Sequence, residues 1–223
     1  MWKSLGNPVP RETPEPYAPM VWPNGATIPL PPVGDIELGS MASALDARIT
    51  RRSFSQVSQP QISALLWHTA RTLQTAASPL GFAIEHRPVP SAGAIHPIHI
   101  LVQSERAQGW ARYCPQHHNL QTVPDADLLV RPLVELCEVI VARDEGALIL
   151  FAAEPGKTAS KYESADSLVW RDAGVLQGHM ALVAAALGLN FCLLGVTGEP
   201  WIADLSEKRQ LRGVGAAILG SRP

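Results

Sequence analysis

The chain has 223 residues, of which 46% are hydrophobic, and a formal net charge of −2 at pH 7. This length supports one sizeable core, and the charge leaves no basic surplus for binding the phosphate backbone of nucleic acid. Three cysteines give no disulfide framework and indicate a reducing, cytoplasmic compartment. The most apolar stretch, residues 180–194, is shorter than the ~20 residues that a membrane span needs, so no membrane association is expected.

Residues 1–37 are predicted to form a proline-rich N-terminal arm. Residues 1–39 hold nine of the twenty prolines, which favour extended backbone. This composition is typical of either a disordered leader or an arm laid across a subunit. Apolar side chains that a pure linker would rarely carry favour the arm, and they are Trp2, Tyr17, Trp22, Ile28 and Leu30.

Two helices are predicted next, over residues 38–50 and about 60–76. The first places Met41, Leu45 and Ile49 four residues apart. The second has Ser58 or Gln59 as its cap and Pro60 in its first turn. Its apolar face consists of Ile62, Leu65, Leu66, Thr69 and Leu73.

The remaining pattern predicts strands and two further helices. Strands are expected at 98–102, in a hairpin at 110–113 and 120–123, at 139–142 and 147–153, and at 216–219. A helix over 125–136 is expected to be interrupted near Pro132, and a helix over 172–187 ends at Gly188. The latter is apolar nearly all round, which is typical of a core or a subunit interface. This order predicts an α+β fold with a mostly antiparallel sheet.

Four segments could bind or transform a ligand. Arg51-Arg52-Ser53 suits a phosphate, although an arginine pair is also common on solvated surfaces. The small residues of the 90–97 turn would let a flat, rigid ligand approach the backbone, and 182–196 reads as a small-residue helix followed by a glycine turn. Lys161-Tyr162 could supply a base, because a lysine in an apolar pocket can lose its proton near neutral pH.

Two other site types are excluded by spacing. Cys114, His117 and His118 have no second ligand cluster, so no metal site is predicted. Gly213-Val214-Gly215 lacks a third glycine in register and a following βαβ unit, which excludes a dinucleotide-binding Rossmann domain.

Taken in order, Arg51-Arg52-Ser53, the 90–97 turn, Lys161-Tyr162, Asp172-Ala173-Gly174 and Gly195 resemble the nitroreductase superfamily. The closest branch is that of the SagB/ThcOx-type dehydrogenases, which includes azoline oxidases. The resemblance implies an FMN-binding domain over residues 38–223 and an intertwined homodimer with FMN at the subunit interface. Ala94 and His96 stand where typical nitroreductases have Asn and Gln, a departure that the azoline-oxidase branch partly shares.

The resemblance also implies roles for individual residues. The FMN phosphate and ribityl chain would be held by Arg51, Arg52, Ser53 and Arg222. The flavin of the other subunit would be lined by Pro90, Ser91, Ala92 and Gly93. A backbone N–H near flavin N5 would come from Leu194, Gly195 and Val196.

The expected activity is a dehydrogenation of a heterocyclic or peptide-derived substrate. Lys161, helped by Tyr162, would remove a ring proton while FMN accepts a hydride. Two alternatives stay open: an NAD(P)H-dependent nitro- or quinone reductase, and a non-catalytic flavoprotein-like partner in a biosynthetic complex.

Overall fold

The computed structural model describes residues 4–34, 38–104 and 108–223, and its central feature is a seven-stranded sheet. The strand order is β10-β11-β8-β5-β6-β7-β2, and every neighbouring pair is antiparallel. The strands are β2 (Thr27–Pro29), β5 (Ile98–Ser104), β6 (Gly109–Cys114), β7 (Asn119–Thr122), β8 (Ala147–Ala153), β10 (Asn190–Leu194) and β11 (Arg212–Gly220). The expected α+β fold with an antiparallel sheet is confirmed.

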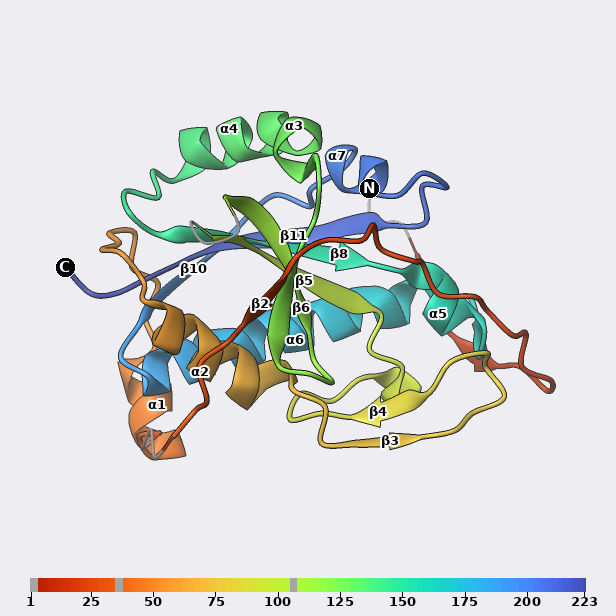
Figure 1. Cartoon of the computed structure of the whole chain (residues 1–223). Coiled ribbons are helices and arrows are strands. Elements are labelled where there is room, and N and C mark those ends of the chain that lie inside the picture. Colours follow the sequence, from red (N-terminus) through yellow and green to blue (C-terminus); the bar gives the residue numbers. More distant parts are fainter. Residues whose placement is uncertain (1–3, 35–37, 105–107) are drawn as a thin grey trace.

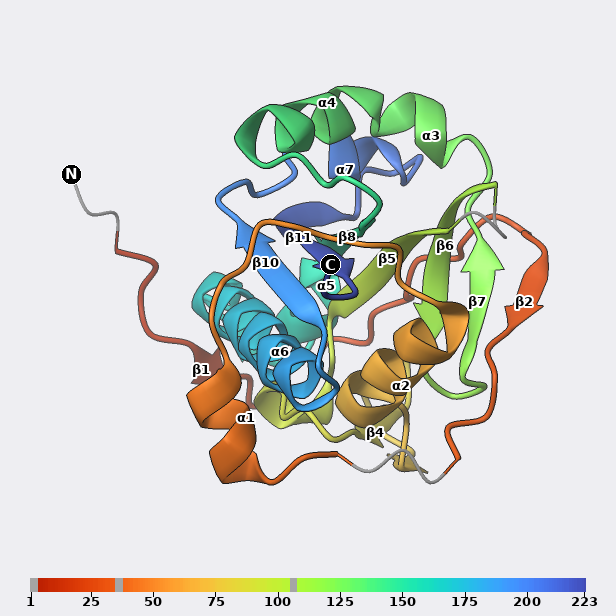
Figure 2. The same cartoon turned by 90° about the vertical axis from the view of Figure 1, so that its left-hand side faces the viewer.

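Helices cover both faces of this sheet (Figures 1 and 2). On one face lie α2 (Gln59–Ala70) and α6 (Asp166–Ala186), with α1 (Met41–Ala47) beside α6. On the other lie α3 (Ala126–Leu129), α4 (Arg131–Ile140) and α7 (Trp201–Asp204). Strand β8 serves both cores, because Ile149 and Phe151 point toward α6 while Leu148 and Leu150 point toward α4.

Helix α2 is shorter than the predicted 60–76 segment. Ser58 and Gln61 form a reciprocal capping box at its start, and the expected apolar face is buried as far as Thr69. The helix ends at Ala70, because the chain turns extended at Arg71 and Leu73 N donates to His86 O. Residues Gln74–Ala76 then form β3, paired with β4 (Ile84–His86). Pairing with β4, the next strand along the chain, overrode local helical periodicity.

The segment around Pro132 differs from its prediction in two ways. The helix break falls at Val130, and Pro132 lies in the first turn of α4, where its missing N–H removes no helical hydrogen bond. The strand predicted at 139–142 does not form. Val139, which is 84% exposed, and Ile140 end α4 instead. Over a short apolar run, hydrophobic periodicity does not distinguish the end of a helix from a strand.

Helix α6 begins at Asp166, six residues before the predicted start, and ends at Ala186, one residue before the predicted end, with Gly188 directly after its C-cap Leu187. Gly188 has a left-handed φ of 71°, and Leu189 N and Gly188 N donate to Ala184 O and Ala185 O. This tight ending returns the chain along the helix as β10. The sequence interpretation of 182–196 as a helix and a glycine turn therefore missed an edge strand of the sheet.

Described residues of the arm run along the rest of the same chain. Strand β1 (Val9–Pro10) pairs with β9 (Tyr162–Glu163), and β2 completes the sheet beside β7. Between them, Tyr17 packs on Gly156 in α5 (Pro155–Ala159), where an added Cβ would lie 2.2 Å from the Tyr17 ring. Trp2, the first expected anchor, lies outside the described residues.

Two surface properties complete the fold. The apolar face predicted for the 38–50 helix is exposed, with Met41, Leu45 and Ile49 each more than half exposed. Of the helices in the described ranges, none is both long and apolar enough to cross a bilayer.

Replacing Gly156 by alanine is expected to destabilise the protein by about 1–3 kcal/mol, because the new Cβ would overlap the Tyr17 ring. The shift in the urea denaturation midpoint measures this cost. In a Tyr17→Ala background the same substitution should cost much less. An equal cost in both backgrounds would show that the arm is not docked through this contact.

Candidate functional site

The segment that follows α1 lies beside the C-terminal end of the chain. Two backbone hydrogen bonds join Ser55 and Ser221, at 3.1 and 3.0 Å, and Asn190 Nδ2 donates to Ser53 O at 2.8 Å. These bonds bring Arg51 close to Arg222, and both side chains line a cavity of about 60 Å³. The cavity lies between the end of α1, the C-terminal half of α6 and β10.

This group of Arg51, Ser53 and Arg222, the basic cleft, is open to solvent. All three residues are exposed, and neither guanidinium forms an ion pair with a carboxylate in the described part of the chain. Asn190 Oδ1 is buried there without a hydrogen-bond partner among the described residues. Two unpaired arginines beside an exposed serine suit the phosphate end of a ligand.

Arg52 takes a different direction from Arg51. Its side chain lies near the Cys192 thiol and does not line the basic cleft. Burial raises the pKa of Cys192, and the Arg52 contact partly offsets that rise. The thiol is 2% exposed and packs in the core on the α4 side of the sheet, which agrees with its expected core role.

The 90–97 turn is held by a buried carboxylate of α6. Ser91 Oγ donates to Asp172 Oδ2 at 2.6 Å, and Ala92 N donates to Asp172 Oδ1 at 3.1 Å. His96 N closes the turn on Ser91 Oγ at 2.9 Å. Burial raises the pKa of Asp172, and the two bonds from the turn lower it. The sequence singled out Asp172 as part of a motif but gave it no role.

Lys161 and Tyr162 meet the same turn. A Cβ added to Gly93, whose φ is 66°, would lie 3.0 Å from Lys161 Nζ and 3.2 Å from Tyr162 Oη. The ammonium lies 5.6 Å from the centre of the Tyr162 ring. Any side chain at position 93 would displace both groups, so the glycine permits their close approach. Gly93, Lys161 and Tyr162 are called the Lys–Tyr cluster below.

The basic cleft and the Lys–Tyr cluster lie apart in one chain. Asp172, which holds the turn, and Ala185, which lines the cleft, are thirteen residues apart on α6. At 1.5 Å per residue their separation along the helix is about 20 Å.

Residues 194–196 lie at the opposite end of β10 from the basic cleft, since Asn190 pairs with Gly220 and Leu194 pairs with Ala216. The Leu194 side chain is buried and Val196 is half-buried, whereas Gly195 is exposed and no atom lies within 4 Å of its missing Cβ. The backbone at Gly195 is therefore accessible to a ligand.

Sequence reasoning missed a group of ionisable residues behind the turn, in which Glu154 is buried and His99 and Lys157 are half-buried. His99 Nε2 lies 3.0 Å from Glu154 Oε2, and Lys157 Nζ donates to His96 O at 3.3 Å. Burial lowers the pKa of Lys157 to about 8 and that of His99 to about 4. The only available sequence signal was Glu154 directly after the apolar run of β8.

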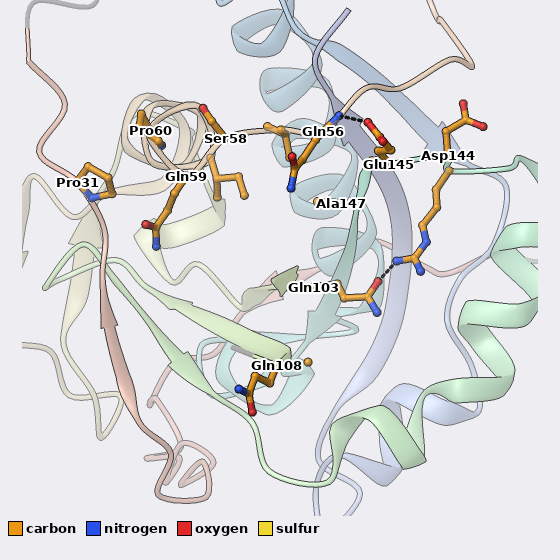
Figure 3. Close-up of a pocket in the computed structure, with 15 residues that line it drawn as sticks. Pro31, Gln56, Ser58, Gln59, Pro60, Gln103, Gln108, Asp144, Glu145 and Ala147 are labelled. Carbon is orange, nitrogen blue, oxygen red and sulfur yellow. Dashed lines mark hydrogen bonds between the residues drawn. The ribbon is translucent and has the colours of Figure 1, made fainter. Parts of the chain in front are cut away.

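A cavity of about 770 Å³ elsewhere in the molecule has a polar lining between α2, β5 and β8 (Figure 3). Its side chains already bond one another, as with Arg143 and Gln103, and Glu145 accepts from Gln56 N. Its described lining includes none of the site residues predicted from the sequence. Among described residues, no three His, Cys, Asp or Glu side chains are grouped as a metal site.

The fold is an antiparallel α+β fold with a basic cleft at one end of an edge strand. A lysine and a tyrosine lie against a small-residue turn. These features are what a site for an anionic, flat ligand would require. A family model described as "Nitroreductase family" matches residues 46–215, and the chain belongs to this family of flavin oxidoreductases. A search of curated proteins finds no match.

Solved structures share this fold. A putative nitroreductase from Ralstonia eutropha JMP134 is 22% identical with a TM-score of 0.69, covering 97% of this chain and 98% of that one. The Escherichia coli microcin synthetase McbBCD complex, solved with truncated pro-MccB17 bound, includes a chain that is 18% identical with a TM-score of 0.56, covering 81% of this chain and 73% of that one. A Bacteroides fragilis nitroreductase crystallised with bound FMN is 14% identical with a TM-score of 0.49, covering 83% and 89%.

Acidification is expected to destabilise the protein through His99. Its folded-state pKa of about 4 lies below the ordinary 6.5, so the unfolded chain binds the proton more readily. This contribution to stability is complete above pH 6.5 and is lost as the pH falls through about 4, at a cost on the order of 1–3 kcal/mol. Urea denaturation between pH 7 and 4 measures this loss of stability.

His99→Gln should flatten the dependence of stability on pH. His117→Gln, at an exposed position, is the control and should leave that dependence unchanged. Identical pH profiles for the wild type and both variants would contradict the assignment to His99.

Proposed function

We propose that the protein is an FMN-dependent dehydrogenase of the SagB/ThcOx type, which removes a proton and a hydride from a heterocyclic or peptide-derived substrate. The observation that carries this proposal is the approach of Lys161 Nζ and Tyr162 Oη to the backbone of Gly93. A base beside a turn suited to a flat ligand is what proton removal from a flavin-bound substrate requires. The likeness of the fold to a chain of the microcin synthetase complex supports the same branch.

The residues present fit FMN. Arg51 and Arg222 offer two guanidiniums to a phosphate, and exposed Ser53 offers a hydroxyl. A ligand anchored there and lying along β10 would reach Gly195, whose backbone is open. Arg52 is assigned a lesser part, because its side chain lies near Cys192 and does not line the cavity.

The exposed apolar faces of α1 and α6 support a homodimer that completes the site. Trp170 and Val175 on α6 are 45% and 43% exposed, and no atom lies within 4 Å of a Cβ added to Gly174 or Gly178. Since the basic cleft and the Lys–Tyr cluster are about 20 Å apart along α6, a second copy would bring its 90–97 turn to the cleft of the first. Each site would then draw residues from both subunits.

The chain's own residues would act in the following way. Lys161 Nζ takes the proton from the substrate carbon, and the Tyr162 hydroxyl beside it shares or relays that proton. Pairing of β1 with β9 and the bond from Arg11 N to Lys161 O, at 2.9 Å, hold the backbone of both residues. Bound FMN supplies the hydride acceptor.

Loss of either cleft arginine should weaken FMN binding about tenfold or more, because each removes charge-assisted hydrogen bonds worth roughly 1.5–3 kcal/mol. Titration of FMN fluorescence against Arg51→Gln and Arg222→Gln measures this effect. Arg212→Gln, at an exposed position on β11, is the matched control. Unchanged FMN affinity in both cleft variants would show that the FMN phosphate binds outside the basic cleft. A wild-type protein that takes up no FMN would favour the non-catalytic alternative.

Lys161→Ala should keep bound FMN but lose about 100- to 10,000-fold in turnover of a thiazoline-containing peptide with O₂ as acceptor. Tyr162→Phe should retain more activity, and Lys208→Ala, on the exposed surface, should behave like the wild type. Unchanged turnover in Lys161→Ala would rule out the base. Reduction of bound flavin by NADPH at catalytic speed, with no peptide oxidation, would favour the reductase alternative.

A further inference from the structure

A third cavity lies on the face of the sheet opposite α6. It measures about 320 Å³ and is bounded by the arm, by β5, β6 and β7, and by Glu154 and Lys157. His99 is paired with Ala152, and Arg112 with Leu101, and both partners belong to the apolar core on the α4 side. Because residues opposite one another in an antiparallel pair share a face, this cavity is separate from the proposed flavin site.

One wall of the cavity is apolar and the other is charged. The arm supplies the apolar wall with Pro19, Met20, Trp22 and Pro23. The sheet supplies Arg112, whose guanidinium lies 5.3 Å from the centre of the Trp22 ring. Two side chains that border the cavity each carry a buried donor without a hydrogen-bond partner in the described ranges, Arg112 Nε and Trp22 Nε1, and Arg112 Nη2 donates to Gln121 Oε1 at 2.5 Å. Buried donors of this kind call for an acceptor.

The charge around the cavity is positive. Glu154 contributes one negative charge, but its oxygens already accept from Tyr17 Oη, Met20 N and His99 Nε2. Arg112 and the Lys157 ammonium contribute two positive charges, and His99 is neutral near pH 7. The net charge of the lining is therefore about +1, which a monoanion would balance.

We propose that this cavity binds a small carboxylate with an apolar body, its carboxylate held by Arg112 and Lys157 and its body against the arm. A planar carboxylate matches the fork of a guanidinium, and the Trp22 ring and the two prolines provide the apolar contact. Inorganic phosphate would satisfy the cations but leave the apolar wall without contacts. Since the arm forms one wall, the bound carboxylate would also fix the arm on the domain.

Binding should weaken as the pH rises through about 8, where Lys157 loses its proton. Burial lowers the pKa of this lysine, and so does the charge of nearby Arg87 and Arg112. Two carboxylates near it act in the opposite direction, and these are Glu85 and Glu154.

The test is calorimetric titration of the full chain with sodium benzoate, with excess FMN present so that the basic cleft does not take up the probe. Benzoate should bind, benzyl alcohol should not, and inorganic phosphate should bind at least tenfold more weakly than benzoate. Arg112→Gln should reduce benzoate affinity about tenfold or more. Arg212→Gln is the control, because among the described residues its guanidinium bonds only backbone oxygens of Arg209 and Leu211.

Lys157→Met gives an independent measurement if Arg112→Gln does not fold. It should weaken benzoate binding at pH 7 and abolish the decline between pH 7 and 9. The proposal is overturned if benzoate does not bind, if benzyl alcohol binds equally well, or if neither variant changes the affinity. Tighter binding of phosphate than of benzoate would identify an inorganic anion site instead.

Discussion

Glu154 is the point at which the sheet, α5 and the N-terminal arm are joined. This carboxylate is fully buried at the end of β8 and accepts hydrogen bonds from Tyr17 Oη, Met20 N and His99 Nε2. Leaving a buried carboxylate without donors would cost several kcal/mol of folding free energy. Two of the three donors, Tyr17 Oη and Met20 N, belong to the arm, so these hydrogen bonds hold the arm in place. Helix α5 follows directly and leads to Lys161 and Tyr162, so the position of the candidate base depends on this carboxylate.

A second buried carboxylate, Asp172, does the same for the small-residue turn. By accepting from Ser91 Oγ and Ala92 N, it ties the turn to α6 and so sets Gly93 against Lys161 and Tyr162. The other end of α6 borders the basic cleft. One long helix therefore separates the two halves of the proposed flavin site.

Periodicity predicted the elements whose hydrogen bonds are local or whose two faces differ. The β6–β7 hairpin, the start of α2 and the glycine end of α6 follow from alternation, a capping box and a left-handed glycine. The failures share a cause. Residues 74–76 and 190–194 are strands because each pairs with a backbone segment outside the predicted element, residues 84–86 for one and 216–220 for the other. At Val139 the error runs the other way: a strand was predicted where the structure has a helix end. A β-branched residue at an exposed helix end has the residue type that is typical of a strand.

The sequence by itself determined the fold class, the family resemblance and the candidate residues, because these depend on residue type, order and spacing. Only the tertiary structure decided which candidates meet: Arg51 with Arg222, Gly93 with Lys161, and Arg52 with Cys192 instead of the cleft. It also showed which donors the carboxylates of Glu154 and Asp172 accept from, and it revealed the cavity beneath the arm, which no local pattern marks. Burial and hydrogen bonding join residues more than a hundred positions apart, and that information lies in packing rather than in any stretch of sequence.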